Sequence, residues 1–259
     1  MLIKGCWILS LYVLLLIGCT SKDIPQEGEI VTWKQDPKLI VKAKLGPRRE
    51  HIPDRFDSEF YKPEREHYLG QFPIDYVPEK FPLLTREEVN SLPMPDSNRQ
   101  LQFNLMLNGS KVQSTDRTLV SEQTLEHTDQ VKVEITGQGL NFNPNYRTKE
   151  GYEKFLEEKK GNYNAQYSAE LGMDCYIPKH NNGKLYCFGE SENKQISGVA
   201  ITLITEEVIL GHSWEPIHGG INVQWRIHKS NLKRWKEVDA AIWRLVDIWN
   251  VSPLASNNS

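Results

Sequence analysis

The sequence predicts a protein of the α+β class, in which antiparallel sheets are each covered by a helix and follow a signal peptide and a proline-rich tether. Short segments of alternating apolar and polar residues recur after Gln100, as in strands with one buried face. Apolar residues have helical spacing in two segments, and the longer one lies near the C-terminus. Ten of the 14 prolines lie between Pro25 and Pro95, which excludes long helices there.

The N-terminus has the features of an export signal. One positive charge, on Lys4, precedes an apolar run from Cys6 to Ile17 that only Ser10 interrupts. The run is shorter than the roughly 20 residues that span a bilayer and is typical of a signal-peptide core. It ends in Leu-Ile-Gly-Cys19, which resembles the bacterial lipobox. The alternative is an ordinary secreted protein whose apolar run stops at a cysteine by chance.

The lipobox resemblance implies that residues 1–18 are removed as a lipoprotein signal peptide. It also implies that Cys19 carries a diacylglycerol and an N-acyl chain such as palmitate. Several acyl chains give stable anchoring to a membrane surface, whereas one is marginal. Thr20 stands where lipoproteins retained in the inner membrane usually carry Asp. We therefore expect an outer-membrane anchor that faces the periplasm, with the inner membrane as the alternative.

Composition limits the mature chain to one large or two small domains. Removal of 18 residues from 259 leaves 241, and the loss of Lys4 changes the net charge from −3 to −4. This charge argues against a nucleic-acid-binding surface, which is basic. Residues 19–63 read as a lipidated, proline-rich tether with one short strand at Leu39–Lys44, because prolines recur along this stretch.

Residues 64–162 are predicted to form an N-terminal α+β module. Residues 101–105 and 131–135 alternate as strands do, and Asn108-Gly109 is typical of a hairpin turn. Thr148 is a plausible N-cap for a helix from Lys149 to Lys160.

Residues 163–259 are predicted to form a C-terminal α+β module that begins with a hairpin. If the turn is centred at Asn181, facing residues have numbers that sum to 362. Cys175 then faces Cys187 and Tyr176 faces Tyr186. Two thiols in an oxidising compartment pair most simply as a disulfide, and two cysteines alone do not make a zinc site.

Two strands and a terminal helix complete this module. The strands are predicted at residues 198–205 and 221–228, and the helix runs from a cap at Ser230 or Asn231 to about Asn250. Its apolar residues fall within one arc, which places Trp235 and Trp249 in the core and Trp243 at the partly exposed edge.

We find no catalytic arrangement, cofactor motif or metal-ligand set in the sequence. Residues 211–215 begin like the G-x-S-x-G nucleophile elbow, but Glu215 replaces the closing glycine and no helix is predicted to follow. His212 and His218 are interpreted as exposed loop histidines. The protein is therefore not expected to be an enzyme.

Two stretches resemble a known family. Residues 67–78, HYLGQFPIDYVP, are similar to the entry segment of immunity proteins paired with type VI secretion lipase effectors, in particular those of the fourth lipase-effector family. Gln71 stands where that family usually has Arg. The second stretch resembles the family's C-terminal domain, and it comprises residues 172–176, 186–189, 197–198, 223–226, 231–235 and 249–251. The resemblance covers about Glu64 to Pro253.

The resemblance implies a lipoprotein that binds and neutralises a phospholipase toxin delivered into the periplasm. A few anchor residues carry most of the energy in such complexes. Our candidates are exposed features of the loop before the last strand, namely Trp214, Glu215 and His218, with Glu206 and Glu207 nearby. The alternative function is a structural or assembly lipoprotein of the envelope that binds a resident partner. A third reading, a secreted lipid- or peptide-degrading enzyme, lacks a catalytic triad.

Overall fold

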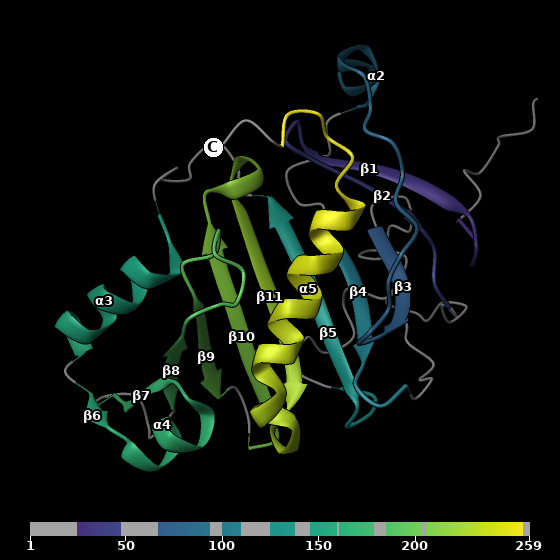
Figure 1. Ribbon diagram of the computed structural model, residues 1–259. Coiled ribbons are helices and arrows are strands. Elements are labelled where there is room, and N and C mark those ends of the chain that lie inside the picture. The colour runs from purple at the N-terminus through teal and green to yellow at the C-terminus, as the bar shows by residue number, and fades with distance from the viewer. Residues whose placement is uncertain are drawn as a thin grey trace, which may run out of the picture.

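A computed structural model describes residues 25–47, 67–93, 100–109, 125–137, 146–159, 161–178, 185–203 and 206–255. The predicted signal peptide, the lipidation site Cys19 and the part of the tether after residue 47 lie outside the described residues. Within them, the predicted α+β class is confirmed. The described residues form one nine-stranded mixed sheet, one two-stranded sheet and four α-helices, arranged as in Figure 1.

The nine-stranded sheet joins segments from most of the chain. In spatial order its strands are β3 (His67–Pro73), β4 (Gln100–Met106), β5 (Gln130–Gly137), β11 (Ile221–His228), β10 (Val208–Glu215), β9 (Val199–Leu203), β8 (Tyr186–Gly189), β7 (Asp174–Ile177) and β6 (Asn162–Tyr163). All neighbours are antiparallel except β3 and β4, so the sheet is mixed where we expected antiparallel sheets. Strands on both sides of the predicted module boundary at residue 163 belong to this one sheet.

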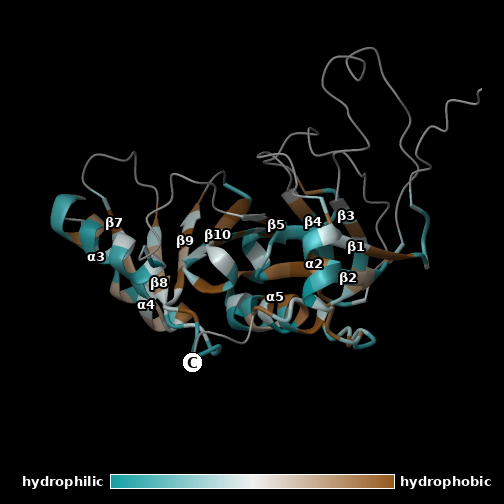
Figure 2. Ribbon diagram, turned by 90° about the horizontal axis from the view of Figure 1, so that it is seen from above, coloured by the Kyte–Doolittle hydropathy of each residue, from teal (hydrophilic) through white to brown (hydrophobic). Residues whose placement is uncertain are grey.

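Alternation along the central strands separates an apolar face from a polar one. In β11 the odd-numbered residues are buried and apolar: Ile221, Val223, Trp225 and Ile227. They share one core with the apolar residues of α5 (Trp235–Trp249), which lies along this face (Figure 2). Because successive side chains of a strand point to opposite faces, the even-numbered residues lie on the face away from α5. We call the face away from α5 the polar face. It is defined by these residues: Lys132, Glu134, His212, Trp214, Asn222, Gln224 and Arg226.

Three smaller helices lie beside the sheet. α3 (Thr148–Lys159) packs against β9 and β10, and α4 (Ala165–Leu171) packs against β7 at the same end of the sheet (Figure 1). α2 (Arg86–Ser91) lies near the two-stranded sheet and begins at a capping box, in which Thr85 and Glu88 satisfy each other's backbone N–H groups. A 3₁₀ helix, η3 (Lys229–Arg234), leads from β11 into α5.

Residues 30–44, assigned to the tether by sequence, form a hairpin on the core. β2 (Leu39–Lys44) coincides with the predicted strand and pairs with β1 (Ile30–Asp36), which sequence reasoning missed. Asn250, at the end of α5, accepts a hydrogen bond from the Ile40 amide (3.1 Å) and donates one to the Lys38 carbonyl (3.0 Å). The hairpin is thus fixed to the C-terminal helix.

The first family-like stretch builds the β3 edge of the sheet. Leu69 and Phe72 are buried in the core, and Gly70 has a φ of 110°. A Cβ added at Gly70 would lie 2.7 Å from the backbone of Gly46, so only glycine fits this close approach. The buried side chains of Leu69 and Phe72 and the close approach at Gly70 thus give a structural reason for the Leu-Gly-Gln-Phe sequence of this stretch.

Candidate functional site

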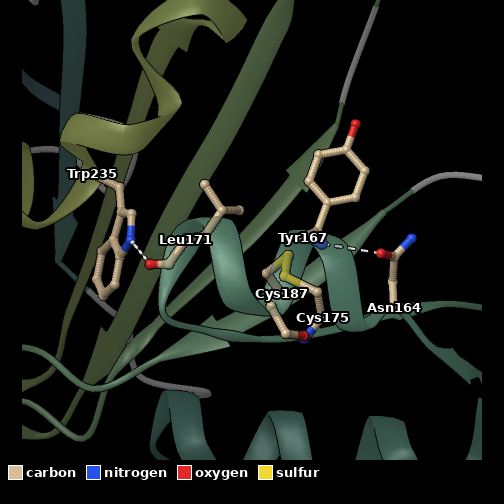
Figure 3. The surroundings of a disulfide bond; sticks show 7 residues. Asn164, Tyr167, Leu171, Cys175, Cys187 and Trp235 are labelled. Carbon is tan, nitrogen blue, oxygen red and sulfur yellow. Dashed lines mark hydrogen bonds between the residues drawn. A yellow bond between two sulfur atoms is a disulfide. The ribbon is translucent and has the colours of Figure 1, made fainter.

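The predicted disulfide is confirmed, and it joins the two strands of the predicted hairpin. Cys175 on β7 is bonded to Cys187 on β8, with Tyr176 opposite Tyr186 in the predicted register (Figure 3). The Ser168 hydroxyl of α4 accepts a hydrogen bond from the Cys175 amide at 3.0 Å. On the other side of α4, the Trp235 indole donates to the Leu171 carbonyl at 2.9 Å (Figure 3). The disulfide, α4 and the first residue of α5 therefore form one rigid unit.

Trp214 is the exposed aromatic residue of the polar face. It is 37% exposed at the end of β10, and its ring lies 5.2 Å from the Tyr146 ring and 6.2 Å from the His212 ring, centroid to centroid. Its amide donates to the Thr148 hydroxyl at 2.7 Å, and this hydroxyl contacts the Trp214 carbonyl at 3.1 Å. Thr148 thus fixes the Trp214 backbone and does not act as the predicted N-cap. A large exposed ring on a fixed backbone suits protein recognition, because little entropy is lost when it is buried.

Charged and titratable groups line the rest of the polar face. Arg226 Nη1 donates to Glu134 Oε1 across two neighbouring strands at 2.9 Å. Burial lowers the pKa of Lys132, although neighbouring carboxylates oppose the shift. Burial also lowers the pKa of His212 to about 4, so this imidazole is neutral at pH 7. His212 is not the exposed loop residue we expected, because it lies on β10 and is partly covered.

Glu215 is buried, which contradicts the prediction that it is an exposed loop residue. It is the last residue of β10 and is 0% exposed. One of its carboxylate oxygens accepts hydrogen bonds from the Ser197 hydroxyl (2.6 Å), the Ser197 amide (3.0 Å) and the Thr148 hydroxyl (3.1 Å). Burial raises the pKa of Glu215, while these hydrogen bonds and Arg147 oppose that shift. Glu215 holds α3 and the 197 loop against β10 and has no surface to offer a partner.

His218 is buried as well, again in contrast to the prediction. It lies in the short 3₁₀ helix η2 (Ile217–Gly219) with a φ of 54°, in the left-handed region. Its Nδ1 lies 3.2 Å from Asn250 Nδ2, beneath the end of α5. It therefore belongs to the α5 side of the sheet, whereas Trp214 belongs to the polar face.

The five predicted toxin-binding residues do not form one cluster. Glu206 and Glu207 are exposed at the start of β10, and Trp214 lies near its end. Seven residue steps along an extended strand place Trp214 about 23 Å from Glu207. Only Trp214, Glu206 and Glu207 present exposed side chains, and their role in binding stays a prediction.

Sequence reasoning missed β10, because Pro216 and the Gly219-Gly220 pair indicate a loop in this region and Gly211 adds to that pattern. Glycine weakens a strand pattern, and we interpreted residues 211–215 as a loop. Gly211 lies opposite Trp225 in the sheet, and a Cβ at this position would lie 2.1 Å from the Trp225 ring. The glycine therefore makes room for a core tryptophan on the neighbouring strand. The Ser213 hydroxyl of the same strand is buried and donates to the Gly198 carbonyl at 2.9 Å.

The described residues hold neither a metal-binding cluster nor a helix that could cross a membrane. No three His, Cys, Asp or Glu side chains there gather in an arrangement that could hold a metal ion. None of the helices in these ranges combines the length and the apolar character that crossing a bilayer requires.

No protein-family model matches the sequence, and neither does any curated protein sequence. The chain is similar to a solved structure, an immunity protein of the Stenotrophomonas maltophilia type IV secretion system. The match covers 61% of this chain and 84% of that one, with 11% sequence identity and a TM-score of 0.30.

Proposed function

We propose that this chain is a lipid-anchored immunity protein that binds a secreted phospholipase toxin in the periplasm and neutralises it. The lipobox resemblance supports the anchor at Cys19, and the two family-like stretches support the type VI lipase-effector pairing. The structural observation that carries the proposal is Trp214, an exposed aromatic side chain whose backbone is fixed by Thr148, on a sheet face that also carries the Arg226–Glu134 pair. Aromatic and arginine anchors of this kind dominate protein–protein affinity.

The proposed mechanism is steric. A phospholipase acts on lipids at a membrane surface, and an inhibitor bound at its cleft keeps those lipids away from the catalytic groups. An acyl anchor at Cys19 holds the inhibitor at the surface where the toxin meets its substrate. Restriction to this surface raises the inhibitor's effective concentration near the toxin without any additional contact.

The first test is binding of the purified, lipidated protein in detergent to the product of the adjacent gene. We expect tight binding that abolishes lipase activity. Trp214→Ala should weaken binding by about 30-fold or more, the effect of an interface hot spot worth at least about 2 kcal/mol. Leu83→Ala is the matched control, because Leu83 is an apolar residue that is 62% exposed and its neighbour Leu84 is hydrogen-bonded to Val251, just after α5.

The outcomes separate the two classes of function. Loss of affinity in the Trp214→Ala protein, with wild-type affinity in the Leu83→Ala protein, would support immunity through this face. If no neighbouring gene product binds, the immunity proposal is wrong and a resident envelope partner becomes the better hypothesis.

A further inference from the structure

A cavity at the β6–β7–β8 end of the nine-stranded sheet has the composition of a cation-binding site. This cavity of about 580 Å³ lies between α3, α4 and the β7–β8 hairpin. Its volume is within the range of small-ligand sites in proteins. None of the residues predicted by sequence to bind the toxin lines it.

Aromatic rings form part of its wall. Tyr152 of α3 and Phe188 of β8 stack with ring centroids 4.5 Å apart and an interplanar angle of 9°, and both are buried. Tyr163 of β6 also lines the cavity and is 56% exposed. Because Tyr152 and Phe188 are buried and stack on each other, Tyr163 is the ring of this wall that a ligand can reach. The faces of aromatic rings carry partial negative charge and attract cations.

Three carboxylates surround these rings. Glu153, Asp174 and Glu190 all line the cavity and are exposed, and none of them forms an ion pair within the described parts of the chain. Asp174 lies opposite Phe188 in the sheet register, and its charge helps burial to raise the pKa of Tyr152. Lys149 is the one basic residue among the described residues that line the cavity, so the lining has a net charge of −2.

We propose that this cavity receives an arginine or lysine side chain of the toxin, an inference that rests on the proposed immunity function. A guanidinium group fits the arrangement best, because it stacks on aromatic rings and binds carboxylates through paired N–H donors. A phospholipid headgroup fits less well, because its phosphate would lie beside three carboxylates.

Trp214 and the cavity both adjoin α3, which is why we assign them to the same partner. Thr148, which holds the Trp214 backbone, is the first residue of α3. Tyr152 and Glu153 follow one turn later, about 6–8 Å further along the helix axis. A partner that covers the Trp214 ring thus needs to extend along α3 to reach the cavity.

The test neutralises the three carboxylates together in the full, lipidated chain. We expect the variant Glu153→Gln/Asp174→Asn/Glu190→Gln to bind the adjacent gene's product about tenfold more weakly than the wild type. The affinity of the wild type should decrease when the NaCl concentration is raised from 50 to 500 mM. The variant should lose most of this salt dependence. The control is Glu29→Gln/Glu79→Gln/Glu87→Gln, which removes the same charge from exposed positions in the N-terminal part of the fold.

A second variant tests the aromatic wall. Tyr163→Ala should weaken binding about two- to fivefold, in line with a cation–π contact at an exposed site. Thermal denaturation of both variants checks that the fold is retained, which we expect because the altered side chains are exposed. If the wild type binds the toxin and both variants bind it with the same affinity and the same salt dependence as the wild type, this inference is wrong and the immunity function is unaffected. Absence of wild-type binding would instead refute the immunity function.

Discussion

Two titratable side chains, the buried Asp239 and the partly covered His212, respond to acid in opposite directions. Asp239 of α5 accepts hydrogen bonds from the Ser191 hydroxyl (2.5 Å) and the Trp243 indole (2.9 Å). Burial raises its pKa to about 6, and the two hydrogen bonds only partly oppose that shift. Burial lowers the pKa of His212 to about 4. The Asp239 bond also explains why Trp243 is buried where the helical arc predicted partial exposure, since its indole N–H has a partner inside the core.

The signs follow from proton binding in the folded and unfolded states. Between about pH 4 and 6, folded Asp239 holds a proton that the unfolded chain has released, so its contribution to the free energy of unfolding falls as pH rises. Between about pH 4 and 6.5, unfolded His212 holds a proton that the folded protein lacks, so its contribution rises with pH. The two contributions largely cancel in the wild type.

Asp239→Asn should expose the hidden pH dependence. The variant removes the Asp239 contribution, and the asparagine amide can still pair with Ser191 and Trp243. Relative to wild type, its free energy of unfolding should increase by about 3 kcal/mol from pH 4 to pH 7, the value of roughly two pKa units. Urea denaturation of both proteins at pH 4, 5, 6 and 7 measures this difference. A difference that stays constant across the four pH values would contradict the assignment.

At the scale of elements, the β7–β8 hairpin depends on its disulfide. The bond closes a segment of 12 positions between Cys175 and Cys187. In the chain-entropy model, closure of a loop of this size stabilises the folded state by about 3 kcal/mol. The hairpin also carries Asp174 and Phe188 of the proposed cation site. Loss of the disulfide is therefore expected to affect this site as well as the stability of the fold.

The variant Cys175→Ser/Cys187→Ser should therefore lose about 3 kcal/mol of unfolding free energy. The measurement is the urea midpoint of the variant against that of the oxidised wild type. Addition of dithiothreitol should lower the wild-type midpoint and leave the variant's midpoint unchanged. Equal midpoints for the variant and the oxidised wild type would show that the bond does not brace the hairpin.

Elements with a strong local pattern could be predicted from the sequence, whereas those set by distant partners could not. β11 has the predicted bounds, and the facing pairs of β7 and β8 follow from the position of the turn. β10 could not be recognised because Gly211 serves a tryptophan on another strand. The helix predicted from Ser230 or Asn231 begins as the 3₁₀ helix η3, and α5 starts at Trp235. Of the candidate site, exposure was predicted correctly for Trp214 but not for Glu215 or His218, because their partners come from α3 and α5.

At the scale of the whole molecule, the folded sheet follows a predicted lipid anchor along the chain. We expect the wild-type protein to fractionate with outer membranes, and Cys19→Ser to abolish acylation and release most of the exported protein from that fraction. Radiolabelled palmitate incorporation and density-gradient separation of membranes measure the two effects. A Cys19→Ser protein that still incorporates palmitate and sediments with membranes would contradict anchoring at this cysteine.

The position of β11 between β5 and β10 has a consequence for how the protein is made. β11 pairs with β5 on one side and β10 on the other, and the Arg226–Glu134 pair joins residues 92 positions apart. Such non-local pairing slows folding, because a long loop must close before its contacts form. Synthesis proceeds from the N-terminus, so β5 exists well before β11 and keeps one edge unpaired until β11 is made. An unpaired edge of this kind invites aggregation, which makes the interval before residues 221–228 arrive the most vulnerable stage in the life of the chain.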